Sequence, residues 1–264
     1  MTPHHALIPL LLGACLAGCA VTPLEVLPPA PLADAAPWPV MGRQGWMPQR
    51  TLRFGDYATR HLASRERDRT TACPGGCTHV DLGLYQRRDD DASRTATQQL
   101  RFTLVGPAGA EADVQLTSRL DQRQRDWITR WFGIPTDAGS DFVRQVSVIG
   151  TVQPADTAQP GWRFALRDEG TPPLHGWAED DTGRRLTLAP LQHFKGRDGL
   201  AMVMPGFAST PTYGYTFELD GQAVAAVATV GGGTVWIRPG VGPELHLSLA
   251  ALASALLLRH EFGH

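Results

Sequence analysis

Beyond residue 50 the chain carries many short runs in which apolar and polar positions alternate, the pattern of half-buried β-strands. The alternation is cleanest between Leu100 and Leu104 (LRFTL), and Asp220-Gly221 predicts a tight hairpin because this pair tolerates positive φ. The segments that we predict to be strands are 51–57, 78–86, 98–105, 111–116, 142–152, 162–167, 174–178, 185–191, 215–219, 223–230 and 234–238. This spacing predicts a mainly β fold: an antiparallel sandwich, a curved sheet or an open barrel.

Two segments with a different pattern predict helices. Asp121–Phe132 (DQRQRDWITRWF) gathers its aromatic residues on one side of a helix, and Gly133 and Pro135 would end it. We expect this short internal helix to pack across the sheet, with a membrane surface as the alternative. The second helix, 243–259, is apolar around nearly its whole circumference, which predicts that it is buried.

The first residues resemble a bacterial export signal. Residues 6–18 are almost wholly apolar, and this run is shorter than the about 20 residues that cross a bilayer but matches a signal-peptide core. It ends in Leu16-Ala17-Gly18-Cys19, which resembles the lipobox of bacterial lipoproteins. The resemblance implies a signal peptide over 1–18 and a cleaved, acylated Cys19 that anchors the chain in a lipid bilayer.

Two other interpretations of the leader stay open: a box ending at Cys15, which is a poorer match, and an ordinary secreted protein. Ala20 follows the proposed lipid cysteine where an Asp would be expected for retention at the inner membrane. In this respect the chain resembles lipoproteins that are sorted to the outer membrane. We therefore expect a lipid-anchored protein of the bacterial cell envelope, at the outer membrane and facing the periplasm.

The segment after the lipobox is rich in proline, with six prolines among residues 20–40. Such segments are extended, at about 3 Å per residue. We predict that residues 19–50 form a lipidated tether, either a plain spacer or a docking strip for a partner. The remainder, 51–264, is then a single β-rich domain that includes the C-terminal helix.

Cys73 and Cys77 lie in the sequence CPGGC. In an oxidising compartment a lone close pair is most simply a disulfide, and the Pro-Gly-Gly between them would let the chain reverse tightly. Loop entropy gives such a bridge roughly 2 kcal/mol. A metal site formed with His79 is the alternative, but it lacks a fourth ligand at a usual spacing.

The last five residues are His260-Glu261-Phe262-Gly263-His264, which resembles the H-E-x-x-H motif of zincin metallopeptidases. The resemblance implies that His260 and His264 bind zinc and that Glu261 activates a metal-bound water. A catalytic zinc needs a third protein ligand, which in zincins follows the motif. The candidates elsewhere in the chain are His79, His175 and His193.

Charge and motifs restrict the function further. The net charge of −2 and the pI of about 6.5 give no basic field for nucleic acid. The sequence contains no P-loop, no G-x-S-x-G elbow and no dinucleotide fingerprint. We expect the acidic clusters at 89–91 and 179–181 to lie in solvated turns. We expect a non-enzymatic binding or structural envelope lipoprotein without a cofactor, with another envelope protein as a possible partner. The alternative is a zinc metallopeptidase.

Overall fold

The computed structural model describes residues 25–43, 51–74, 76–168, 175–195, 201–202 and 212–259. The strands are β1 (Trp38–Pro39), β2 (Arg53–Phe54), β3 (Tyr57–Ala72), β4 (Thr78–Asp81), β5 (Tyr85–Val105), β6 (Glu111–Trp131), β7 (Ile134–Pro154), β8 (Trp162–Asp168), β9 (His175–Asp180), β10 (Arg185–Leu191), β11 (Phe194–Lys195), β12 (Ala201–Met202), β13 (Gly214–Leu219), β14 (Gln222–Ala228) and β15 (Thr234–Ile237). The helices are the short 3₁₀ helices η2 (Ala30–Leu32) and η3 (Pro107–Gly109) and the α-helix α1 (Pro243–Leu258).

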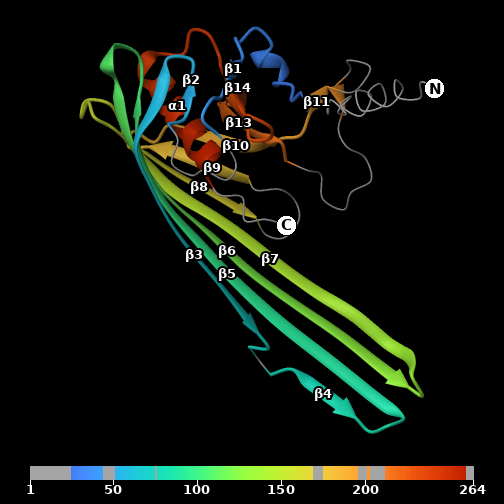
Figure 1. The fold of residues 1–264 in the computed structure, drawn as a ribbon. Coiled ribbons are helices and arrows are strands. Elements are labelled where there is room, and N and C mark those ends of the chain that lie inside the picture. The colour runs from blue at the N-terminus through green and yellow to red at the C-terminus, as the bar shows by residue number, and fades with distance from the viewer. Residues whose placement is uncertain are drawn as a thin grey trace, which may run out of the picture.

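One antiparallel sheet contains nearly all the strands, in the order β1-β15-β14-β13-β10-β9-β8-β7-β6-β5-β3-β2, with β4 added beside β5. The sheet curves until its two edges meet. Met41, just after β1, forms an antiparallel bridge with Arg53 of β2 through two backbone hydrogen bonds of 2.8 and 3.0 Å. The result is a nearly closed barrel (Figure 1). This confirms the predicted mainly β, antiparallel fold and selects the open barrel among its possible forms.

Helix α1 lies inside the barrel and contacts β6 and β7 on one side and β14 and β15 on the other. This position explains why its sequence is apolar all round, and residues such as Leu249 and Leu252 are fully buried. Its buried hydroxyls bond within the helix, since Ser254 donates to the Ala250 carbonyl at 2.8 Å. Of the helices in the described residues, none has both the length and the hydropathy of a membrane span.

Residues 25–43, assigned above to an extended tether, pack on the outer face of the barrel. Val26, Leu32 and Ala35 are buried there against Tyr213 and Trp236, and Val40 joins the interior core. The prediction of a spacer is therefore wrong for this part of the chain. Its apolar residues cover the outer face of β14, both of whose faces are buried. This double burial explains the continuous apolar sequence of that strand.

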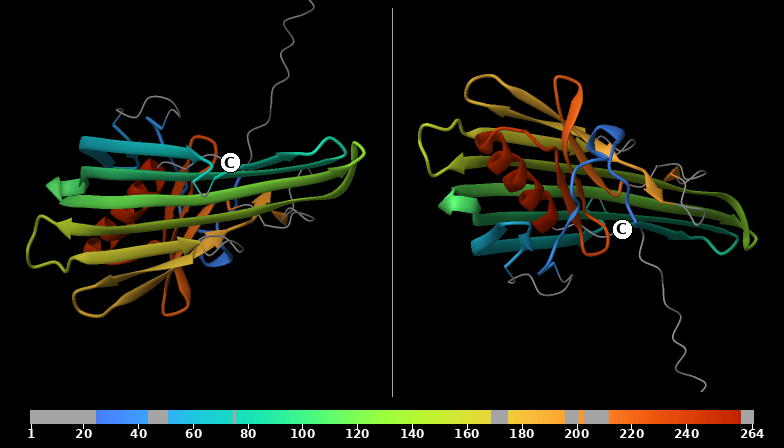
Figure 2. Two further views of the ribbon diagram at one scale, coloured as in Figure 1. Left: turned by 90° about the horizontal axis from the view of Figure 1, so that it is seen from below. Right: turned by 90° about the horizontal axis from the view of Figure 1, so that it is seen from above.

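Strands β5, β6 and β7 are each 21 residues long, about 70 Å, and reach far beyond the barrel. We call the projecting part the arm, residues 64–95 and 121–145; it contains the distal halves of β3, β5, β6 and β7 together with β4 (Figure 1). Both views in Figure 2 show α1 at the opposite end of the long strands from the free end of the arm. The arm is therefore a four-stranded ribbon, and no helix of the described residues lies on either of its faces.

The predicted helix Asp121–Phe132 is wrong, because these residues form the distal half of β6 and the turn that follows it. Their backbone groups pair with β5 on one side and β7 on the other. The spacing of the tryptophans that suggested a helix has another cause. The ring of Trp127 lies over Gly139 of β7, and Trp131 packs edge-on against Tyr85 of β5 with centroids 5.0 Å apart. Pairing on both sides overrides the weak local preference for a helix.

Candidate functional site at the end of the arm

The arm contains almost no apolar core. Among its described residues only Asp91 is buried, whereas the same strands bury Leu100, Leu116 and Val148 inside the barrel. The last fully enclosed layer is a small cluster of Ala96, Leu120 and Val146 at the base of the arm. Beyond it both faces of the ribbon meet solvent, so ladder hydrogen bonds and polar side chains must hold the arm together.

Ion pairs between neighbouring strands take the place of a core. Arg123 of β6 pairs with Asp91 of β5 at 2.6 Å, Arg125 with Asp89 at 3.2 Å, and Arg94 of β5 with Asp68 of β3 at 2.6 Å. The hydrogen bond from Arg125, with a further one from Arg87, holds the pKa of Asp89 below its ordinary value.

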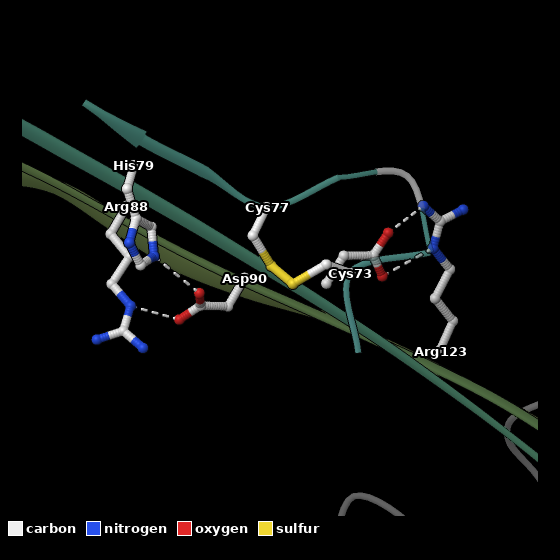
Figure 3. Close-up of a disulfide and its surroundings, with 7 residues drawn as sticks. Cys73, Cys77, His79, Arg88, Asp90 and Arg123 are labelled. Carbon is white, nitrogen blue, oxygen red and sulfur yellow. Dashed lines mark hydrogen bonds and ion pairs between the residues drawn. A yellow bond between two sulfur atoms is a disulfide. The ribbon is translucent and has the colours of Figure 1, made fainter. Parts of the chain in front are cut away.

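The acidic cluster 89–91 was expected in a solvated turn; instead it lies within β5 and is bonded to basic side chains. The hydrogen bond from His79 lowers the pKa of Asp90, and the one from Arg123 lowers that of Asp91. Asp90 also pairs with Arg88 at 2.6 Å. Figure 3 shows His79 and Arg88 converging on Asp90. These contacts leave the cluster bound within the arm rather than open to a cation.

Cys73 and Cys77 form a disulfide, with Cα atoms 5.0 Å apart (Figure 3). The Gly76 N–H donates to the Cys73 carbonyl at 2.9 Å, so the predicted tight turn lies between the two cysteines, but the strands on either side of it do not form a hairpin. Strands β3 and β4 are both antiparallel to β5 and therefore run in the same direction. The bridge closes a short loop between these two consecutive strands and so fixes the position of β4 beside β5.

The far end of the arm is apolar. Five side chains, which we call the tip, are largely exposed there: Leu82 (73%), Leu84 (58%), Trp131 (49%), Phe132 (70%) and Ile134 (67%). They come from two adjacent turns, one between β4 and β5 and one between β6 and β7. The Phe132 N–H donates to the Leu84 carbonyl at 2.7 Å, which joins the two turns. Of the nine large apolar side chains exposed among the described residues, five thus gather at one point.

The turn between β6 and β7 holds Phe132 in a strained backbone conformation. Trp131 pairs with Ile134, so Phe132 and Gly133 form a two-residue loop, and both have positive φ, 50° and 77°. Turns of this kind favour Asn-Gly, because a bulky side chain at positive φ is strained. A phenylalanine at this position is an outlier of the kind that gathers at functional sites.

The remaining residues that the sequence indicated as functional are placed as follows. Cys19, His260, Glu261 and His264 lie outside the described residues. Helix α1 ends at Leu258, and Arg259 after it has non-helical angles (φ −59°, ψ 132°). Within the described parts of the chain, no group of three His, Cys, Asp or Glu side chains is arranged to hold a metal ion.

One partly buried polar contact was not expected from the sequence. His246 of α1 lies 2.6 Å from the Tyr57 hydroxyl through its Nδ1, stacks on the ring of Tyr57 and also contacts Trp38. Burial raises the pKa of Tyr57 to about 12 and lowers that of His246. The contact joins the first turn of α1 to β1 and β3, so we read it as a structural link within the barrel.

The tip was not identified from the sequence either, although a signal for it exists. Leu82-Gly83-Leu84 and Phe132-Gly133 combine turn-forming glycines with large apolar residues, at positions where turns are usually polar. Comparison with protein-family models, with curated proteins and with solved structures gives no match. The physical features of the arm and its tip therefore carry the functional argument.

Proposed function

We propose that this chain is a non-enzymatic, lipid-anchored protein of the bacterial cell envelope whose arm places its tip in the interface of a lipid bilayer. The observation that carries the proposal is the gathering of Leu82, Leu84, Trp131, Phe132 and Ile134 on two adjacent turns at the most distant point of the fold. A contiguous exposed apolar patch marks a surface that is covered in function.

The chemistry of the tip favours a bilayer as the covering surface. The apolar side chains project from turns, as insertion into a soft layer requires. One of them, Trp131, is in edge-to-face contact with Tyr85, which lies directly behind the tip. Tyr and Trp are the residues that collect at membrane–water interfaces, because their rings are apolar and their polar groups can stay hydrated.

Charge plays a minor part in this contact. Of the basic residues behind the tip, Arg87 and Arg88 are paired with Asp89 at 3.1 Å and Asp90 at 2.6 Å, whereas Arg130, next to Trp131 and opposite Gln86, forms no ion pair with another described residue. One arginine is thus left near the tip to attract anionic lipids. We expect apolar burial to supply most of the affinity, so that binding persists at high salt.

The dimensions of the arm suit this role. From Leu120 at its base to Trp131 the arm extends by eleven residues, about 36 Å at about 3.3 Å per residue. The barrel can therefore remain in water while the tip touches lipid. In this proposal acylated Cys19 supplies a separate attachment, so the molecule has two lipid contacts, one covalent and one reversible.

Flotation with phospholipid vesicles tests the proposal. The chain with Cys19→Ala, from which the apolar leader 1–18 has been removed, has no lipid and no leader, so its binding reports on the tip alone. We expect it to float with vesicles at both low and high salt. Substituting Leu84, Phe132 and Ile134 together by Ser should reduce partitioning by roughly tenfold or more, because burying one such side chain contributes up to about 1.5–3 kcal/mol.

The matched control carries Met41→Ser and Ile149→Ser, which remove two exposed apolar side chains of the barrel. This variant should float like the parent chain. Equal binding by the tip variant and the control, or no binding by the parent chain, would contradict the proposal.

A further inference from the structure

The arm has two free edges. On one side, β3 pairs with β2 only at Ala58 and Tyr57, so no described strand pairs with its outer edge from Ala63 to Ala72. On the other side, β8 pairs with β7 only from Val146 to Val152, so no described strand pairs with the outer edge of residues 134–145. Two open edges of similar length are unusual, because exposed edges invite pairing with other chains.

The two edges carry opposite charges on the same face of the ribbon. Residues paired across the four strands share a face, and the series Arg69, Thr95, Asp121 and Gln145 is paired in this way. Because side chains alternate along a strand, two further sets of residues lie on the face of this series. They are Arg65 and Arg67 on β3, and Asp137 and Asp141 on β7.

These charges are available for an intermolecular contact. Arg65, Arg67, Arg69, Asp137 and Asp141 form no ion pair with another described residue, in contrast to the acidic and basic residues of the inner strands. Phe142 and Val143 are exposed on the same stretch of the β7 edge, one on each face. They are the only large apolar side chains described as exposed on the arm apart from the tip.

We propose that arms of neighbouring copies join edge to edge, with β7 of one copy beside β3 of the next. The directions are compatible, because β3 runs from the barrel toward the tip and β7 runs back, so the new pair is antiparallel like every other pair in the sheet. A register with Asp141 opposite Arg69 places Val143 opposite Arg67, where the arginine stem covers it. On the other face Arg144 then lies opposite Glu66.

The same charges disfavour the other pairings. Two β3 edges would bring arginines together, and two β7 edges would bring aspartates together, and like charges across a strand pair are destabilising. Charged edge strands usually prevent edge-to-edge association of any kind. Here the charges permit only the pairing of a β3 edge with a β7 edge. Pairing of two different surfaces produces a ring if the rotation closes. All tips would then lie at the same end of the assembly, which would multiply their individual weak contacts with lipid.

Oligomeric state in solution tests this inference without reference to lipid binding. The Cys19→Ala chain should assemble across the micromolar range, as measured by light scattering after size exclusion and by native mass spectrometry. Asp141→Arg alone or Arg69→Asp alone should shift it to monomer, and both changes in one chain should restore assembly. Arg163→Asp, on the outer surface of the barrel, is the control and should leave assembly unchanged.

Disulfide crosslinking tests whether β3 of one copy lies beside β7 of the next. In the proposed register Thr70 and Ser140 are opposite each other, so chains with Thr70→Cys mixed with chains with Ser140→Cys should form a disulfide-linked heterodimer, whereas Thr70→Cys chains alone should not. A parent chain that stays monomeric in solution and on vesicles would overturn the inference. Assembly that persists in both single charge variants would overturn it as well, whatever the tip does on lipid.

Discussion

Phe132 has positive φ in a two-residue turn between β6 and β7, at a position where Asn is favoured. On our account the chain retains an aromatic ring here because the ring contacts lipid. Phe132→Asn should therefore raise the free energy of unfolding of the arm, by up to about 1 kcal/mol, while it weakens vesicle binding. Hydrogen exchange of the β6–β7 amides and flotation of the same sample measure the two effects. A loss of both stability and binding would contradict this explanation.

His246 provides a second test at a single residue. Burial lowers its pKa from the ordinary value of 6.5, so below that value the unfolded chain takes up a proton more readily than the folded chain. The stability that this group contributes is complete above pH 6.5 and is lost as the pH falls through the folded pKa. His246→Phe keeps the ring contacts with Tyr57 and Trp38 but removes the titration. Urea unfolding at pH 7.5 and pH 5 should show a smaller pH dependence in the variant than in the parent chain; an unchanged difference would exclude this role.

Among the structural elements, most strands that form the barrel were predictable, whereas in the arm the predicted strand 78–86 includes β4 but the distal halves of β3, β5 and β6 were not predicted. LRFTL alternates because Leu100, Phe102 and Leu104 face the core while Arg101 and Thr103 face water. The distal half of β6 has solvent on both faces, so burial imposes no alternation on DQRQRDWITRW. The predicted strand 78–86 covers β4 and the first residues of β5, but the prediction missed the turn at Gly83 between them. Alternation of apolar and polar residues indicates a strand only where one face is buried. It gives no signal where a strand is stabilised by backbone pairing and by ion pairs.

The disulfide belongs to the arm, so its removal should act on the arm and not on the barrel. Replacing both Cys73 and Cys77 by Ser removes roughly 2 kcal/mol of loop constraint by the entropy model, from a segment without an apolar core. We expect faster proteolysis between β3 and β4 and an almost unchanged thermal melt of the barrel. A large drop in the melting temperature would mean instead that the arm and barrel unfold as one unit.

The whole molecule combines a filled barrel with a projecting arm. The apolar sequence of α1 predicts burial, but no local pattern indicates that the sheet closes around it through the Met41–Arg53 bridge. In the same way, the tip depends on the contact between two turns that are nearly fifty residues apart in the chain. Pairing between strands that are far apart in the chain positions the candidate site. No local pattern in a single sequence predicts which distant strands pair.

The most direct measurement of the central claim is the environment of the tip on a membrane. A solvent-sensitive fluorophore would be attached through a cysteine at Phe132 in the tip, at Gln124 on the inner strand β6 in the middle of the arm, or at Ile149 on the barrel, in the Cys19→Ala chain. With phospholipid vesicles the account predicts a blue-shifted, brighter emission at Phe132 and unchanged emission at Gln124 and Ile149. No change at Phe132, or an equal change at Ile149, would contradict it.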